Sequence, residues 1–340
     1  MNIRRFRHTG LLVIPTAVLL LAAACSKSTT GTTGPSGGGS PAKSLKVAIV
    51  APSATNDLAF TQSMVDAVNS LKTKYNLQIS ISDNQFVVAD AANAIRTYAS
   101  QGYDLVIAHG SQYGGTIQQL ASQFPKVSFA WGTAGDTFGQ PNVFAYQAAS
   151  DQGGYVQGKM AAALTKSKVL GVVGPIEVGD AKLYVDGFRA GAAAQDPSVD
   201  VRVNYTGSFS DVALASAAAT SFVAAGADAM TGSAQMVVGA IGVCKAKNVA
   251  WFGTQANQTS LASNIVVSSQ VYHWEVALSQ IFDAIKAGTL GGKTYDITLA
   301  NGGEVIEYNA AFPLSPDVKA VGDQAIAGIK SGSITTGVSG

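Results

Sequence analysis

Short apolar runs alternate with amphipathic stretches along most of this sequence, and this pattern limits the folds that the chain can adopt. The first half predicts strands at residues 45–50, 78–82, 105–108 and 127–131, with helices near 57–75 and 90–101. Apolar strands that alternate with helices of this length are typical of a parallel sheet covered by helices on both faces. The first half therefore predicts one doubly wound lobe.

A second series of the same kind begins after Val143-Phe144-Ala145-Tyr146. It predicts helices near 151–164, 180–196, 212–225 and 235–247, and strands at 169–173, 199–205, 229–231 and 249–252. Two doubly wound lobes on one chain place a crevice at the carboxyl ends of their strands. We expect an α/β fold of two Rossmann-like lobes with a ligand in this crevice.

The last part of the chain is too short to form a third domain. It predicts a strand at 265–271, a helix at 274–287, a β-hairpin of 295–300 and 304–308 that turns at 301–303, and a helix at 317–331. We expect this part to complete both lobes, so that three segments cross between them. The expected boundaries are 44–146 with 270–298 for the N-terminal lobe and 147–269 with 299–340 for the C-terminal lobe.

The N-terminus has the three parts of a secretory signal peptide. Arg4, Arg5 and Arg7 precede an apolar run at 11–24, which ends in small residues before Cys25. This run is shorter than the roughly 18 to 20 residues that a membrane-spanning helix needs. We therefore predict a signal peptide at 1–24 that is removed after export.

Cys25 follows Leu21-Ala22-Ala23-Ala24, which resembles a bacterial lipobox, although the leucine stands one position further from the cysteine than usual. The resemblance implies that Cys25 carries a lipid anchor, and residues 25–43 have the Ser-, Thr- and Gly-rich composition of a flexible linker. A cysteine that merely follows an ordinary cleavage site is the alternative. The other cysteine, Cys244, fits a small buried residue within a helix.

The charge balance argues against a nucleic-acid partner. The chain has 22 Lys and Arg and 21 Asp and Glu, and removal of the signal peptide leaves 19 basic residues. No block of basic residues remains to neutralise a phosphate backbone.

Catalytic motifs are lacking in the sequence. The two histidines after the signal peptide, His109 and His273, show no metal-ligand spacing and no Gly-x-Ser-x-Gly motif. Residues 288–294 imitate a phosphate-binding loop, but they are one residue short and follow a helix, which favours a helix cap and turn. We expect neither an enzyme, nor a cofactor, nor a metal site.

Five short motifs occur in the order found in a known family. They are Asp57-Leu58-Ala59-Phe60-Thr61-Gln62, Gly153-Gly154-Tyr155-Val156-Gln157-Gly158, Gly187-Phe188-Arg189-Ala190-Gly191, Tyr205-Thr206-Gly207-Ser208-Phe209-Ser210-Asp211 and Gly226-Ala227-Asp228. With them, the chain from about residue 45 to its end resembles the basic membrane protein (PnrA-like) substrate-binding lipoproteins of bacterial ABC transporters. The resemblance implies the two-lobed type I periplasmic-binding fold and uptake of a purine nucleoside or nucleobase.

The resemblance also implies residues of the site. Phe60 would stack on the base, while Asp57 and Asn56 would supply hydrogen bonds from the same strand-to-helix turn. Two alternatives stay open from the residues themselves. Phe60 also fits a core contact in the first turn of its helix, and Asp57 fits a helix N-cap.

Two departures from the family's pattern weaken the expectation of a nucleoside. Nucleoside-binding members carry an Asp in a Gly-Val-Asp turn and a later Lys, whereas this chain has Phe252-Gly253-Thr254-Gln255 and then Tyr272. The amide of Gln255 can both donate and accept hydrogen bonds, which is how amides read an adenine edge. A free nucleobase or another flat polar solute therefore fits as well.

Further candidates for the cavity wall follow the ends of predicted strands. They are Ser111, Gln112, Tyr113, Trp131, Tyr184, Gln235, Tyr272 and Trp274. Aromatic side chains at such places supply contact area at low entropic cost. For each of them, packing in the core is the alternative.

Together these features predict an exported, lipid-anchored binding protein of an ABC importer. We expect it to be a monomer, to close on a small solute by rotation near Tyr146, Ser269 and Thr298, and to deliver the solute to permease subunits. A lipoprotein that senses its ligand and signals through a membrane receptor is the alternative.

Overall fold

A computed structural model describes residues 44–338, which belong to one compact unit. The predicted signal peptide at 1–24, the predicted lipidation site Cys25 and the whole predicted linker at 25–43 lie outside the described residues. Within the described range, every helix is too short or too polar to cross a membrane.

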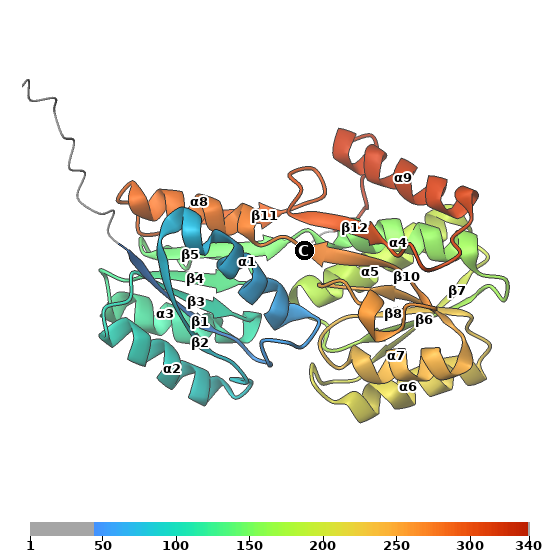
Figure 1. Cartoon of the computed structure of the whole chain (residues 1–340), viewed down its shortest axis with the longest axis horizontal. Helices are drawn as coiled ribbons and strands as arrows, with labels where there is room; N and C mark the ends of the chain where they lie inside the picture. The colour runs from blue at the N-terminus through green and yellow to red at the C-terminus, as the bar shows by residue number, and fades with distance from the viewer. Residues whose placement is uncertain (1–43, 339–340) are drawn as a thin grey trace, which may run out of the picture. The chain divides into compact units, whose positions relative to one another are not determined.

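The first lobe is built on a six-stranded sheet in which every strand pair is parallel (Figure 1). Its order is β11-β5-β4-β3-β1-β2. The strands are β1 (Leu45–Val50), β2 (Leu77–Ser82), β3 (Leu105–His109), β4 (Ser128–Gly132), β5 (Val143–Ala148) and β11 (Lys293–Ile297).

Helices cover both faces of this sheet. Val47 and Ile49 of β1 pack with α1 (Phe60–Tyr75) and α8 (Glu275–Lys286), whereas Ala48 and Val50 pack with α2 (Val88–Ser100) and α3 (Gly114–Gln123). Successive side chains of a strand point to opposite faces, so an unbroken apolar run serves both layers.

The second lobe has a six-stranded sheet of the order β12-β10-β9-β8-β6-β7, in which only β12 runs antiparallel to its neighbour. The strands are β6 (Val169–Gly174), β7 (Asp200–Tyr205), β8 (Ala229–Gly232), β9 (Ala250–Gly253), β10 (Val266–Tyr272) and β12 (Glu304–Tyr308). One face carries α4 (Ser150–Leu164), α5 (Gly179–Gln195) and α9 (Pro316–Ser331), and the other carries α6 (Val212–Ala224) and α7 (Val237–Lys247). Cys244 of α7 is buried in the second of these layers, as predicted.

The chain crosses between the lobes three times: between β5 and α4, between β10 and α8, and between β11 and β12. Hydrogen bonds tie the crossings together, because Ala149 donates its N–H to Ile297 and His273 donates its N–H to Gly303. The predicted hairpin of 295–300 and 304–308 is wrong. Its turn residues do form a tight loop, but β11 pairs with β5 in one sheet and β12 pairs with β10 in the other.

Close packing of α4 against α5 explains two of the glycine-rich motifs. A Cβ atom at Gly158 would overlap the backbone of Phe188, and one at Gly191 would overlap the backbone of Tyr155. The absence of side chains at these positions lets the two helix backbones approach closely. These motifs therefore serve the core of the second lobe.

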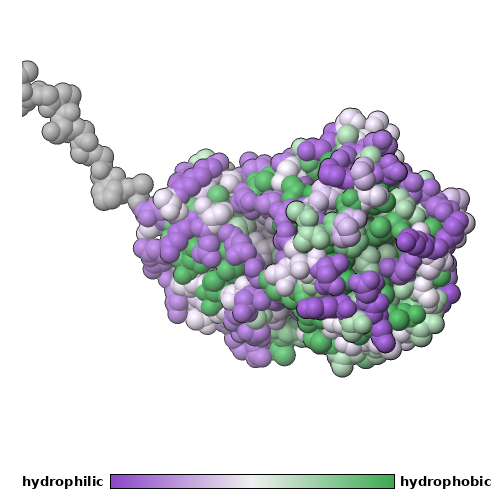
Figure 2. Space-filling model, turned by 45° about the vertical axis from the view of Figure 1, so that its right-hand side comes forward, coloured by the Kyte–Doolittle hydropathy of each residue, from purple (hydrophilic) through white to green (hydrophobic). Residues whose placement is uncertain are grey.

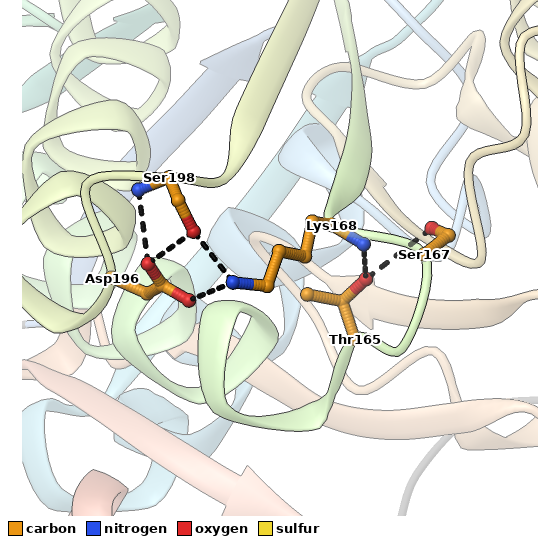
Figure 3. A network of polar contacts seen from close by, with 5 residues as sticks. All are labelled: Thr165, Ser167, Lys168, Asp196 and Ser198. Atoms are coloured by element: carbon orange, nitrogen blue, oxygen red, sulfur yellow. Dashed lines mark hydrogen bonds and ion pairs between the residues drawn. The ribbon is translucent and has the colours of Figure 1, made fainter.

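At the amino ends of β6 and β7, a polar network ties two turns of the second lobe together (Figure 3). The ammonium group of Lys168 lies 2.7 Å from the Ser198 hydroxyl and 3.3 Å from the Asp196 carboxylate. Because its groups are largely exposed, this network contributes little to stability. Polar and apolar side chains are interspersed over the face shown in Figure 2, as the low content of charged residues leads one to expect.

Candidate functional site

A cavity lies where the carboxyl ends of the strands of the two lobes meet, and both lobes line it. Its empty volume, including the part open to solvent, is about 400 Å³. The first lobe contributes Pro52, Phe60, Phe86, Gly110, Ser111, Gln112 and Thr133. The second lobe contributes Asp180, Ala181, Phe209, Ala234, Gln235 and Gln255.

Phe60 begins α1 and presents its ring to the cavity on a base of further aromatic rings. The imidazole of His109 is stacked behind it, with 3.8 Å between ring centroids and 11° between planes. Tyr146 continues the stack behind His109, and Trp274 meets both of these rings edge-on. The ring of Phe60 is therefore supported by rings from β3, from β5 and from the start of α8.

The hydrogen bonds of His109 determine its protonation state. Nε2 lies 3.1 Å from the carbonyl oxygen of Phe60, which only accepts, so Nε2 carries the proton and Nδ1 accepts from the Tyr146 hydroxyl at 2.8 Å. Burial lowers the pKa of His109 to about 3, against the smaller opposing effect of its hydrogen bond to Phe60. His109 is consequently a neutral ring with both nitrogens satisfied.

A second hydrogen-bond chain reaches the same carbonyl group. The indole N–H of Trp274 donates to the Ser63 hydroxyl at 3.0 Å, and that hydroxyl donates to the carbonyl of Phe60 at 2.7 Å. Fully satisfied buried networks of this kind fix a single arrangement. The position of Phe60 is thus determined by contacts from four different elements.

Asp180 is the one titratable side chain among the described residues that line the cavity. Its carboxylate accepts from the Thr133 hydroxyl of the first lobe at 2.9 Å and from the Tyr272 hydroxyl at 3.2 Å. Burial raises the pKa of Asp180, and hydrogen bonds from Thr133, Tyr272 and Gln255 act in the opposite direction. This carboxylate links the two lobes across the cavity.

The backbone around Gln255 adopts an uncommon conformation. Gln255 and Ala234, which both line the cavity, have φ angles of 69° and 75°. Left-handed backbone at residues other than glycine is costly and is concentrated at functional sites. Here it turns residues that follow β8 and β9 towards the cavity.

A second buried carboxyl group, that of Glu304, lies where the third crossing enters β12. Its Oε1 accepts from the N–H of Gly153 and from the amide of Gln270, whereas its Oε2 and the Gln270 Oε1 have no partner within residues 44–338. Burial raises the pKa of Glu304 to about 8, although these two hydrogen bonds lower it. With its pKa near 8, Glu304 is largely protonated at neutral pH.

Five of the residues singled out from the sequence line the cavity. They are Phe60, Ser111, Gln112, Gln235 and Gln255. Trp131 borders a neighbouring groove that shares Ser111, Thr133 and Asp180 with the cavity. Tyr272 borders another groove on the far side of Gln255 and reaches Asp180 through its hydroxyl.

The structure places the other predicted residues away from the cavity. Asn56 is exposed, and Asp57 accepts hydrogen bonds from the backbone of Ala59, Thr61 and Gln62, which makes it an anion at the N-terminus of α1. Their place beside Phe60 in the sequence does not bring them to the cavity.

Three aromatic predictions also fall elsewhere. The hydroxyl of Tyr113 donates to the carbonyl of Gln85, that of Tyr184 contacts Gln157 and Thr231 inside the second lobe, and Trp274 lies behind Phe60. Tyr184 faces the core because α5 packs against α4 at this position.

Among the cavity residues that were not predicted from the sequence are Phe86, Thr133, Asp180 and Phe209. Phe86 and Phe209 come from opposite lobes, and their ring centroids lie 6.4 Å apart. A signal existed for Phe209, which lies within the motif at 205–211, and for Thr133, which directly follows β4. Asp180 had no comparable signal, because its partner Thr133 belongs to the other lobe.

The described range contains no group of three or more His, Cys, Asp or Glu side chains arranged to hold a metal ion. Two doubly wound lobes, three crossings and a cavity between them define the class of two-lobed solute-binding proteins. Within this class, the chain belongs to the PnrA-like substrate-binding proteins of ABC transporters, whose family model matches residues 44–322. Members of this family are extracytoplasmic binding proteins and not enzymes.

Relatives of known name cover most of the chain. The transcriptional activator protein med of Bacillus subtilis is 26% identical over 79% of this chain and 83% of its own length. A purine-binding protein of Brucella abortus is 25% identical over 85% of this chain and 82% of its own. The nucleoside-binding protein BmpA of Lactococcus lactis is 26% identical over 76% of this chain and 80% of its own.

A solved structure agrees with the fold. The ABC transporter solute-binding protein of Conexibacter woesei has 26% sequence identity and a TM-score of 0.70, and the match covers 86% of this chain and 98% of that one. The expected type I periplasmic-binding fold is thereby confirmed.

Proposed function

We propose that the chain is the solute-binding lipoprotein of an ABC importer and that it binds a purine nucleobase, a nucleoside or a similar flat polar solute. The observation that carries this proposal is the ring of Phe60, which borders the cavity and is held from behind by neutral His109. Phe209 borders the same cavity from the second lobe. Two rings from opposite lobes suit a flat aromatic solute between them.

The polar side chains of the cavity suit the edge of such a ring. Amides of Gln112, Gln235 and Gln255 and the hydroxyl of Ser111 surround the aromatic residues. Amides both donate and accept, which matches the mixed edges of purines. The names of the Brucella and Lactococcus relatives support the same class of solute.

A free nucleobase fits this cavity as well as a nucleoside does. Gln255 stands where nucleoside-binding members have an Asp, and none of the described lining residues is a Lys or Arg. A ribose would therefore lack the charged partners that the family's nucleoside site provides.

Binding would be completed by closure of the lobes. Ala149 of the first crossing is hydrogen-bonded to Ile297, and His273 of the second is hydrogen-bonded to Gly303. Both partners belong to the third crossing, so the three crossings can rotate together as one hinge. The Thr133–Asp180 hydrogen bond joins the lobes in the closed form. A lipid on Cys25 would hold the monomer at the extracytoplasmic face of the cell membrane, beside its permease.

Calorimetric titration with purine bases and nucleosides tests the proposed solute. We expect at least one purine to bind with an affinity that falls in Phe60→Ala and is kept in Tyr75→Phe, which removes a hydroxyl from the same core far from the cavity. No heat with any purine, together with a different solute identified by mass spectrometry after purification, would overturn the assignment. Labelling with a radioactive lipid precursor, lost in Cys25→Ser, tests the anchor.

A further inference from the structure

One buried atom of the cavity wall lacks a partner. The side chain of Gln255 is 3% exposed and borders the cavity, yet its Oε1 has no hydrogen-bond partner in the described part of the chain. Buried polar atoms in folded proteins are nearly always hydrogen-bonded. This oxygen therefore needs a donor that the described residues do not supply.

Asp180 determines which end of the amide faces the cavity. Its carboxylate is hydrogen-bonded to the side chain of Gln255 as well as to the hydroxyls of Thr133 and Tyr272. Because the Oε1 of Gln255 has no partner, the atom of Gln255 that bonds to Asp180 is its amide nitrogen, which donates. The carbonyl end is then the one left for a solute.

Tyr272 holds both residues in place. Its backbone N–H donates to the main-chain carbonyl of Gln255 at 3.2 Å, and its hydroxyl donates to the carboxylate of Asp180 at 3.2 Å. Gln255 is thus fixed at its backbone and at its amide nitrogen, and its left-handed φ angle of 69° leaves few other arrangements.

We propose that Asp180 is a positioning residue that locks the Gln255 amide with its carbonyl oxygen towards the solute, so that the cavity selects a solute with an N–H donor at this point. The solute class is accordingly a flat heterocycle with an amino or imino group on the edge next to Gln255. This inference rests on the proposed function for the identity of the heterocycle. The amide orientation itself does not depend on it.

In Asp180→Asn, we expect a change in solute selectivity that loss of stability alone would not produce. An asparagine at position 180 offers both a donor and an acceptor, so the Gln255 amide can turn either way. The cavity should then accept donor-bearing and donor-lacking solutes more equally.

The ligand-free protein provides the first test. In ¹⁵N-glutamine-labelled full-length protein, the Gln255 amide signals are assigned by their loss in Gln255→Met. We expect their protons to exchange with water at least about 10-fold more slowly than those of exposed Gln118, and this protection to fall in Asp180→Asn. Equal exchange at both glutamines would overturn the locked orientation.

The second test uses pairs of purines that differ by an amino group replaced with a methyl group of similar size, such as adenine and 6-methylpurine, and 2-aminopurine and 2-methylpurine. For one pair, the methyl analogue should bind wild type about 10-fold more weakly. The ratio should fall to about 1–2 in Gln255→Met and become intermediate in Asp180→Asn. Tyr75→Phe, which removes a hydroxyl in the core of the first lobe far from the cavity, should keep the ratio.

Each result decides one of the two proposals. Equal binding within every pair, or an unchanged ratio in Gln255→Met, would overturn the selection of a donor. If no purine binds, the proposed function fails, and the exchange measurement still decides the orientation. If Asp180→Asn does not fold, Gln255→Met decides the role of the amide and the wild-type exchange rate decides its orientation.

Discussion

The two lobes contribute different kinds of side chains to the cavity lining. The first lobe contributes the ring of Phe60, held by a stack of neutral rings, and one amide, whereas the second lobe contributes two amides, left-handed backbone and the one carboxylate of the described lining, beside the ring of Phe209. A stacked ring supplies contact area with little dependence on the identity of the solute, and oriented polar groups discriminate between solutes. The difference indicates that the first lobe supplies affinity and the second supplies selectivity.

The lobes also differ in how they keep a buried ionisable group uncharged. His109 of the first lobe does so by losing its proton, and Glu304 of the second does so by retaining one. The two lobes should therefore respond to pH in opposite directions, which provides the largest of the expected effects.

Acidification should weaken the first lobe. The pKa of His109 is about 3 in the folded protein and 6.5 for a free histidine, which stands for the unfolded chain. Between pH 6.5 and pH 3, the unfolded chain therefore binds one proton more than the folded protein at this residue. The free energy of unfolding should fall as pH drops from 6.5 to 3, by up to about 5 kcal/mol from this group. Urea denaturation of wild type and His109→Gln across this range measures it. An equal loss in both proteins would contradict the role of His109.

Rising pH should weaken the second lobe. Because the pKa of Glu304 is raised from 4.5 to about 8, the folded protein retains a proton that the unfolded chain releases. Between pH 4.5 and 7.5, wild type should lose up to about 4 kcal/mol relative to Glu304→Gln, whose amide can donate to Gln270 at every pH. Denaturation curves at both pH values check this. Glu307→Gln on the same strand, where Asn257 contacts the carboxylate near the surface, serves as the control.

Replacement of Phe60 by alanine should remove most of the affinity supplied by the first lobe. Loss of the buried ring contact corresponds to about 3 kcal/mol, or roughly 100-fold in Kd. Calorimetry measures the change, and thermal unfolding without solute shows whether stability falls by less. Unchanged affinity would mean that Phe60 serves only the core.

Thr133→Val should give the smallest effect. The substitution keeps the shape of the side chain and removes the donor that joins the first lobe to Asp180. One hydrogen bond to a carboxylate is worth about 1–2 kcal/mol, part of which is recovered from water when the lobes open, so we expect Kd to rise about 5-fold. Small-angle scattering with and without solute should show a larger share of the open form. An unchanged Kd would show that closure does not depend on this contact.

Much of the fold follows from patterns within short stretches of the sequence. Apolar runs of strand length, interrupted by helices, are enough to predict two parallel sheets and the edge at which a ligand binds. The hairpin was mispredicted because Asn301-Gly302-Gly303 determines a local turn, whereas the partners of β11 and β12 depend on two separate sheets. Local turn chemistry does not encode that choice.

The cavity was predictable only in part. Strand ends identify Phe60, Ser111, Gln235 and Gln255, since chain direction alone brings them to one edge. Asp180 and Tyr184 lie one turn apart on the same face of α5, but only the first turn of this helix reaches the cavity, so Asp180 lines it while Tyr184 packs in the core. Where a helix meets the cavity depends on how it packs, which the sequence pattern does not give.

Tyr272, His273 and Trp274 are consecutive, and they connect to the supports of both walls. Tyr272 holds Gln255 and Asp180, Trp274 holds Phe60 through Ser63, and His273 is hydrogen-bonded to the next crossing. A substitution at His273, which lies at the crossing and outside the cavity lining, would shift the balance between open and closed forms without adding or removing a contact to the solute. Natural variation or engineering at this position could thus change the apparent Kd for the solute without changing which solute is bound.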